Sequence, residues 1–153
     1  MLASGQAEAF EAARPYLEKI GKNIFFLGEP AFATKMKLIN NLVLGNFMAV
    51  LAEAVTMGER TELEKEAVIE ILSAGAGNSA VMNAKKQKML DNDFETHFSA
   101  ALIYKDLHYL QDLAKTLGTP LFTAAVVKEL FGMTFKDNNE KMDMSVIYKI
   151  LKN

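Results

Sequence analysis

Lys37 and Asn41 are the first residues in this chain whose types and spacing could support a reaction. They stand four residues apart at the entrance of a long apolar stretch, so in a helix both project from one face. A lysine beside apolar surface can take or give a proton when burial lowers its pKa, and an asparagine one turn on can hold a substrate hydroxyl or carboxylate. The alternative is a surface lysine whose stem covers apolar atoms beside an unrelated amide.

Lys105 and Asp106 form a second polar pair, which interrupts an apolar helical pattern. In one interpretation Lys105 meets an anion or a cofactor hydroxyl, and Asp106 orients its neighbours. In the other interpretation the two residues are a solvated charged pair near the middle of a helix. The expected core positions around them are Phe94, Leu102, Ile103, Leu110 and Leu113.

The remaining chemistry-bearing residues are few. His97 and His108 are too far apart in sequence for an i, i+4 metal pair, and each is interpreted as a hydrogen-bonded structural histidine. The absence of cysteine excludes disulfides, thiolate catalysis and cysteine-based metal sites. No metal site is therefore expected.

The composition is that of an ordinary globular chain. Its 153 residues suffice for one domain with a real core, and a formal net charge of −2 favours neither nucleic acid nor an anionic membrane as a partner. The apolar run at 42–55 is shorter than the ~20 residues of a membrane span, so it is expected to be a buried helix rather than a membrane segment. Residues 1–5 are too short and uncharged for a signal peptide, and a cytoplasmic location is expected.

The first thirty residues predict a strand, a helix and a strand. Residues 1–3 and the run NIFFLG at 23–28 suit two strands, and a helix between them would begin at Ser4 and end at Gly21. Pro15 lies inside this helical pattern and could kink it. The apolar stripe of the helix comprises Ala9, Phe10, Ala13, Leu17 and Ile20. Such a βαβ piece leaves a sheet edge and a face uncovered, so it is expected to belong to a larger α/β domain.

After Pro30 the pattern is helical nearly throughout, which predicts a mainly α body. The expected helices span residues 31–58, 63–74, 79–90, 99–117, 120–132 and 143–152. A polar loop is expected at 136–143, and Asp143 is predicted to cap the last helix. The domains expected on this basis are 1–30, the end of a truncated nucleotide-binding domain, and 31–153, a helical domain.

Three segments in this order resemble the C-terminal helical domain of the β-hydroxyacid dehydrogenases. They are KMKLINNLVLGNFMAVLAEAV at 35–55, FETHFSAALIYKDLHYLQDLAKTLGTPLF at 94–122, and DMSVIYKIL at 143–151. The family includes 3-hydroxyisobutyrate dehydrogenase, tartronate semialdehyde reductase and, more distantly, 6-phosphogluconate dehydrogenase. The resemblance implies an all-helical domain like the C-terminal domain of 6-phosphogluconate dehydrogenase, preceded by a short βαβ remnant of a Rossmann domain.

The resemblance also implies roles for individual residues. The family pattern G-x-G-x-x-x-K-x-x-N-N places the catalytic lysine at Lys37 and the substrate-binding asparagine at Asn41. The K-D-L motif implies that Lys105 contacts a nicotinamide cofactor, NAD or NADP, while Phe98 matches a position near the nicotinamide ring. Asp106 resembles the helix-stabilising aspartate of the same motif.

Two departures from the family qualify these expectations. The motif glycines are replaced by Ala31 and Ala33, whose methyl groups could crowd a ligand or shift the loop. No G-x-G-x-x-G follows a strand, so the cofactor is expected to be bound mainly by an N-terminal domain outside this chain, and the chain alone is expected to be inactive. The family implies a small hydroxyacid substrate and a homo-oligomer, either a dimer or a tetramer. The alternative is a stand-alone helical dimerisation or scaffold protein without catalysis.

Overall fold

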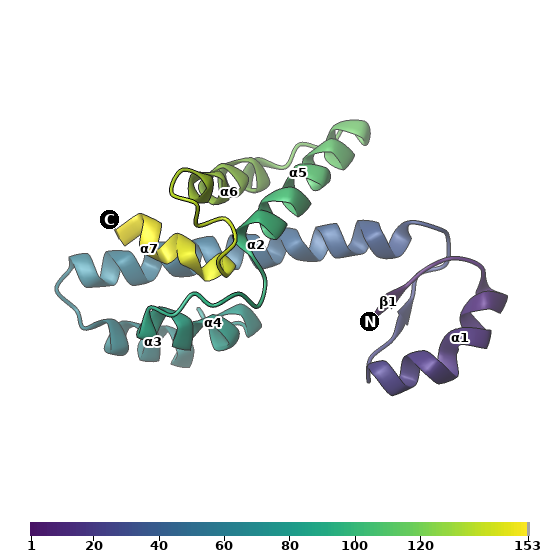
Figure 1. The fold of residues 1–153 in the computed structure, drawn as a ribbon, viewed down its shortest axis with the longest axis horizontal. Helices are drawn as coiled ribbons and strands as arrows, with labels where there is room; N and C mark the ends of the chain where they lie inside the picture. Colours follow the sequence, from purple (N-terminus) through teal and green to yellow (C-terminus); the bar gives the residue numbers. More distant parts are fainter. Residues whose placement is uncertain (153) are drawn as a thin grey trace. The chain divides into compact units, whose positions relative to one another are not determined.

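The computed structural model describes residues 1–152 and shows a mainly α protein, as the sequence predicts (Figure 1). Its contacts divide it into two compact units, Met1–Asn40 and the remainder from Asn41 onward. The long helix α2 (Phe32–Arg60) contributes to both units. Each unit is described by itself.

The first unit contains the predicted βαβ piece. Strands β1 (Leu2–Ala3) and β2 (Phe25–Phe26) pair in parallel, and helix α1 (Ala7–Ile20) connects them. A parallel pair requires such a crossover, because a tight turn can join only antiparallel strands. The ring of Phe10, which is buried, stacks on the ring of Phe26 with centroids 4.3 Å apart.

One prediction for this unit is wrong. Ser4 does not cap α1, which starts after Gln6; the Ser4 hydroxyl instead accepts a hydrogen bond from the backbone N–H of Ala33 at 3.1 Å. The chain turns at Gly5, whose φ of +137° favours glycine, and this turn moves the helix start further along the chain. Ile20, the last residue of the predicted apolar stripe, is 75% exposed. Pro15 lies inside α1 without ending it.

The second unit is helical, with boundaries close to those predicted. After α2 come α3 (Lys65–Ala74), α4 (Ala80–Asp91), α5 (Ala100–Thr116), α6 (Phe122–Gly132) and α7 (Ile147–Lys152). The 3₁₀ turns η1 (Met133–Phe135) and η2 (Met144–Val146) precede α7. Asp143 caps this last segment as predicted, although the first turn that it caps is 3₁₀ rather than α. In Figure 1, α3 and α4 lie together on one side of α2, and α6 lies on the other.

One face of α2 forms the centre of this unit's core. Met48, Ala52 and Val55 are fully buried there and belong to the same apolar cluster as Ile103 of α5 and Tyr148 of α7. Other members of the cluster come from α4, α6 and η2: Met82, Met89, Phe131 and Met144. Several of the nine methionines therefore fill the core, as expected for this flexible side chain.

The opposite face of α2 is exposed, so within this chain the predicted buried helix is buried along one face only. Val43, Phe47, Val50 and Met57, called the α2 stripe below, are 48%, 48%, 62% and 64% exposed. The shorter helices pack on the flanks of α2 and leave this stripe uncovered. By length and composition alone α2 could cross a membrane, but 44% of its most apolar window is buried within the fold, and core helices of many proteins meet the same criterion.

Candidate functional site

A hydrogen bond between α2 and α5 joins two of the polar residues identified in the sequence. The Asn41 side-chain amide donates to Asp106 Oδ2 at 2.7 Å, and only 6% of Asn41 and 2% of Asp106 is exposed. An ionised carboxylate can only accept, so this contact directs the NH₂ group of Asn41 toward Asp106. The interpretation of Asp106 as a solvated charge is wrong; it is a buried group that orients a neighbour.

Lys105 lies beside the same carboxylate but keeps access to solvent. Its Nζ is 3.5 Å from Asp106 Oδ1, and 46% of its side chain is exposed. The ammonium also lies 5.9 Å from the ring centroid of Tyr109. Asp106 therefore sits between a buried amide and a half-exposed ammonium.

Lys37 lies on α2, four residues before Asn41, and its side chain is exposed. The helix is continuous over both residues, so the spacing that predicts them on one face is confirmed. The alternatives for Lys37, a catalytic group or a surface lysine, concern its chemistry rather than its position, and this geometry is compatible with both.

Phe98 immediately precedes the N-cap of α5 and is partly buried against the core. Its backbone is held at both ends. The Phe98 N–H donates to Asp143 Oδ2 at 3.1 Å, and its carbonyl accepts from Met144 N at 2.8 Å. The position of this ring is thus set by the chain around residue 143.

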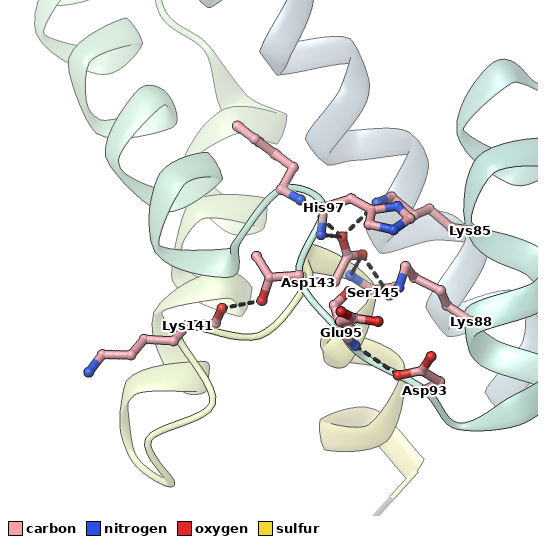
Figure 2. A network of polar contacts seen from close by, with 10 residues as sticks. Lys85, Lys88, Asp93, Glu95, His97, Lys141, Asp143 and Ser145 are labelled. Carbon is pink, nitrogen blue, oxygen red and sulfur yellow. Dashed lines mark hydrogen bonds and ion pairs between the residues drawn. The ribbon is translucent and has the colours of Figure 1, made fainter.

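Asp143 and Lys85 are the residues near this region that the sequence analysis missed. Asp143 was predicted only as a cap, yet its fully buried carboxylate also forms an ion pair of 2.7 Å with Lys85 of α4 (Figure 2). A signal for Lys85 was present in the sequence, because it shares a helical face with the buried Val81, Met82 and Met89. A lysine on an apolar face requires an acceptor, and the local pattern of α4 does not show which distant residue supplies it.

The electrostatics of Asp143 follow from these contacts. Burial raises the pKa of its carboxyl, but hydrogen bonds from Lys85 and Ser145 outweigh burial, and the pKa lies below the ordinary value. Asp143 is therefore a carboxylate at neutral pH.

The histidines have no catalytic geometry of their own. His108 Nε2 is 3.7 Å from Asp112 on the exposed side of α5. The backbone N–H of His97 donates to Asp143 Oδ2 at 3.2 Å, while the His97 side chain is exposed, so a structural role of its imidazole stays a prediction. Within residues 1–152 no group of three or more histidine, aspartate and glutamate side chains is placed to hold a metal ion.

The family model described as NAD-binding of NADP-dependent 3-hydroxyisobutyrate dehydrogenase matches residues 32–151. The chain belongs to this family. The match begins at the first residue of α2 and ends in α7, so it covers nearly all of the helical part of the protein. The resemblance inferred from the three sequence segments is confirmed.

The relatives of this chain, a member of the 3-hydroxyisobutyrate dehydrogenase family, include enzymes and a nuclear factor. It is 34% identical over 148 residues to 2-(hydroxymethyl)glutarate dehydrogenase of Eubacterium barkeri, covering 95% of this chain and 49% of the relative. It is 32% identical over 149 residues to the cytokine-like nuclear factor N-PAC of Homo sapiens, covering 97% of this chain and 27% of that protein. The chain thus spans about half, or less, of the curated relatives it matches.

The fold has a close match among solved structures. The crystal structure of 3-hydroxyisobutyrate dehydrogenase from Salmonella typhimurium superposes with a TM-score of 0.91 at 27% identity, covering 96% of this chain and 52% of that chain. The mainly α fold of this family, with its short βαβ piece, is therefore the fold of this protein.

Proposed function

We propose that this chain is the C-terminal part of an NAD(P)-dependent β-hydroxyacid dehydrogenase similar to 3-hydroxyisobutyrate dehydrogenase. The observation that carries the proposal is the buried hydrogen bond between Asn41 and Asp106, one helical turn from Lys37. Lys37 and Asn41 are one turn apart in the sequence of α2, and a lysine and an amide are the groups that a small hydroxyacid requires for proton transfer and orientation. The family membership supplies the reaction class.

In this proposal Lys37 is the general base and general acid. It takes the proton of the substrate hydroxyl when the hydroxyacid is oxidised to the carbonyl product, and it returns a proton when the reaction runs as a reduction. A nicotinamide bound at this site would supply the hydride acceptor or donor for the carbon that bears this hydroxyl. Asn41 holds the substrate, because Asp106 takes one N–H of its amide group and leaves the second N–H to donate to a hydroxyl or carboxylate oxygen of the substrate.

Lys105 and Phe98 would contact the cofactor. The half-exposed ammonium of Lys105 retains donors for a cofactor hydroxyl or phosphate, and the partly exposed ring of Phe98 offers an apolar surface. These residues fit one side of a nicotinamide nucleotide. The chain has no G-x-G-x-x-G, so we infer that a nucleotide-binding domain outside this chain supplies most of the cofactor contacts.

A consequence is that the chain alone should turn over no hydroxyacid and should bind NAD or NADP weakly. Calorimetry with the isolated chain tests this expectation. A micromolar dissociation constant for either cofactor would show that the helical part binds the dinucleotide without a fingerprint loop.

The alternative is a helical dimerisation or scaffold module without catalysis. The observation in its favour is that N-PAC, named as a nuclear factor, is about as similar to this chain as the dehydrogenase relative is. The two proposals differ in what Lys37 does, so the kinetic experiment below separates them.

The experiment compares three lysine variants of the protein that carries this chain together with its nucleotide-binding domain. Lys37→Ala should lower kcat about 10²–10⁴-fold with little change in cofactor affinity, because only proton transfer is lost. Lys105→Ala should chiefly raise the dissociation constant of NAD(P). Lys35→Ala is the matched control, since Lys35 is an exposed lysine of the same helix whose ammonium lies over the Phe32 ring.

The measurements are steady-state kinetics with small hydroxyacids and cofactor titration by fluorescence. Equal and mild effects of all three substitutions would mean that Lys37 and Lys105 are ordinary surface lysines. Absence of turnover in the unsubstituted protein, with cofactor binding absent as well, would favour the scaffold alternative.

A further inference from the structure

Two segments far apart in the sequence run side by side just before α5. One is residues 94–99, called the Phe98 segment, and the other is residues 140–145. Asp143 N donates to the Phe94 carbonyl at 3.0 Å, and Ala100 N donates to the Met142 carbonyl at 2.9 Å. Ser99 and Asp143 form an isolated antiparallel bridge. The backbone that leads into α5 is thus paired with the backbone that leads into α7.

The carboxylate of Asp143 is the centre of this pairing. Its Oδ2 accepts from Lys85 Nζ at 2.7 Å and from the backbone N–H groups of His97 and Phe98 at 3.2 and 3.1 Å. Its Oδ1 accepts from the Ser145 N–H at 3.1 Å and from the Ser145 hydroxyl at 2.8 Å. Figure 2 shows Lys85, His97 and Ser145 converging on the Asp143 carboxylate from α4, the Phe98 segment and η2. Five donors to two oxygens satisfy the acceptor capacity of this group, and the backbone donors among them restrict two segments at once, residues 97–98 and Ser145.

Lys85 makes this arrangement stable. Its side chain is 8% exposed, and the Asp143 side chain is fully buried. A carboxylate in such surroundings is costly unless a charge of opposite sign lies beside it. The ammonium of Lys85 supplies that charge from α4, a helix that carries none of the residues assigned to substrate or cofactor.

We propose that Lys85 and Asp143 are positioning residues, which hold the backbone of His97 and Phe98 and thereby set the Phe98 ring and the start of α5. This inference rests on the proposed function, because it assigns the ion pair to the site through Phe98 and through the helix that carries Lys105 and Asp106. Ser99 is the N-cap of α5, with its hydroxyl 3.3 Å from Leu102 N, so a shift of the Phe98 segment moves the first turn of that helix. Lys105 and Asp106 follow within the next two turns.

Two other lysines provide contrast, Lys88, which is buried, and Lys65, which is partly buried. Lys88 Nζ donates to the Glu95 carbonyl at 2.6 Å and so contacts the Phe98 segment without touching Asp143. Lys65 Nζ donates to the Met89 and Leu90 carbonyls at 2.9 and 2.7 Å, at the C-terminal end of α4 and outside the Phe98 segment. Lys65 is the matched control, because its loss removes partly buried ammonium contacts of similar length without altering the Phe98 segment.

The experiment uses Lys85→Met, which keeps an unbranched apolar stem and removes the charge, with Lys65→Met as control and Lys85→Arg as the conservative variant. The protein is the one that includes the nucleotide-binding domain. Amide hydrogen exchange at residues 97–103 and the dissociation constant of NADP⁺ are measured well below the melting temperature. Lys85→Met should speed exchange at His97 and Phe98 about tenfold or more and weaken NADP⁺ binding about tenfold. Lys65→Met should change neither, at a comparable loss of thermal stability, and Lys85→Arg should restore most of both.

A milder variant keeps the proposal testable if Lys85→Met does not fold. Ser145→Ala removes one donor from Asp143 Oδ1 and should change exchange at His97 and Phe98 in the same direction by a smaller factor. Its control is Thr134→Val, which removes another buried hydroxyl hydrogen bond, to the Phe131 carbonyl at 2.7 Å.

The outcomes separate this inference from the function on which it rests. Unchanged exchange at His97 and Phe98, or equal effects of Lys85→Met and Lys65→Met on NADP⁺ binding, would overturn the positioning role. If the unsubstituted protein binds neither NAD nor NADP, the proposed function fails. In that case, faster amide exchange at His97 and Phe98 in Lys85→Met alone would still show that this ion pair fixes the backbone of the Phe98 segment.

Discussion

At the scale of single residues, two buried aspartates determine the geometry of the candidate site. Asp106 directs the amide of Asn41, and Asp143 holds the backbone of Phe98. An ammonium lies beside each carboxylate, but Lys105 beside Asp106 is half exposed, whereas Lys85 beside Asp143 is buried. Removing either carboxylate would leave a buried donor without an acceptor, which typically costs ~1–3 kcal/mol and more for a charged group.

Ala31 carries a residue-scale prediction about backbone strain. Its φ is +70°, a left-handed conformation that costs an L-residue with a side chain roughly 1–2 kcal/mol, and the family pattern has glycine here. We expect Ala31→Gly to raise the free energy of unfolding by up to about 1 kcal/mol, because relief of strain exceeds the added chain entropy of the unfolded state. Urea denaturation measures the change.

The matched control is Ala33→Gly, two residues on and inside α2, where a glycine should instead lower stability by up to about 1 kcal/mol. If both variants lose stability, the left-handed conformation of Ala31 does not measurably lower the free energy of unfolding.

At the scale of elements, a polar cluster attaches α7 to the end of α2. The Tyr148 hydroxyl donates to Glu59 Oε2 at 2.7 Å, and Lys152 Nζ donates to Glu59 Oε1 at 2.7 Å. Burial raises the pKa of Tyr148 to about 12, and its hydrogen bond to Glu59 adds to the increase. The neutral phenol is therefore the form that the fold stabilises.

The pH dependence of this attachment follows from the sign of the shift. A pKa raised in the folded state gives stability that is fully present below the unfolded pKa, 10.0, and is lost as pH rises toward about 12. We expect Tyr148→Phe to be less stable at neutral pH by ~1–3 kcal/mol, through loss of a hydrogen bond to a carboxylate, and to lose less stability above pH 10.0 than the unsubstituted protein. Tyr109→Phe is the control, as Tyr109 is 53% exposed. Parallel alkaline curves for all three proteins would contradict this assignment.

At the scale of the whole molecule, the α2 stripe is the feature that the fold leaves uncovered. Hollows of about 330 and 640 Å³ flank it near Val50, one lined by residues of α2, α3 and the start of α4, the other by residues of α2 and α6. An exposed apolar face between two hollows is typical of a surface that another protein covers. We propose self-association through this face, as the family resemblance implies.

The prediction is that the protein elutes with a mass above its 16.9 kDa monomer and that Val50→Glu shifts it toward the monomer. A carboxylate at the centre of an apolar interface would be buried without a partner in the oligomer. Leu117→Glu is the control, because Leu117 is 65% exposed but lies at the end of α5, outside the stripe. Light scattering coupled to size exclusion gives the mass. A monomer that persists at high micromolar concentration would refute self-association.

The sequence by itself determined the features that depend on neighbours along the chain. Helix bounds follow from apolar periodicity and local caps such as Asp143, and the shared face of Lys37 and Asn41 follows from their spacing within one helix. Only the tertiary structure decided which distant side chains meet: Asn41 with Asp106 across 65 positions, and Lys85 with Asp143 across 58. It also decided which face of α2 stays exposed. The physical reason is that local hydrogen bonding defines a helix, whereas the partner of a buried charge depends on how separate helices pack against one another.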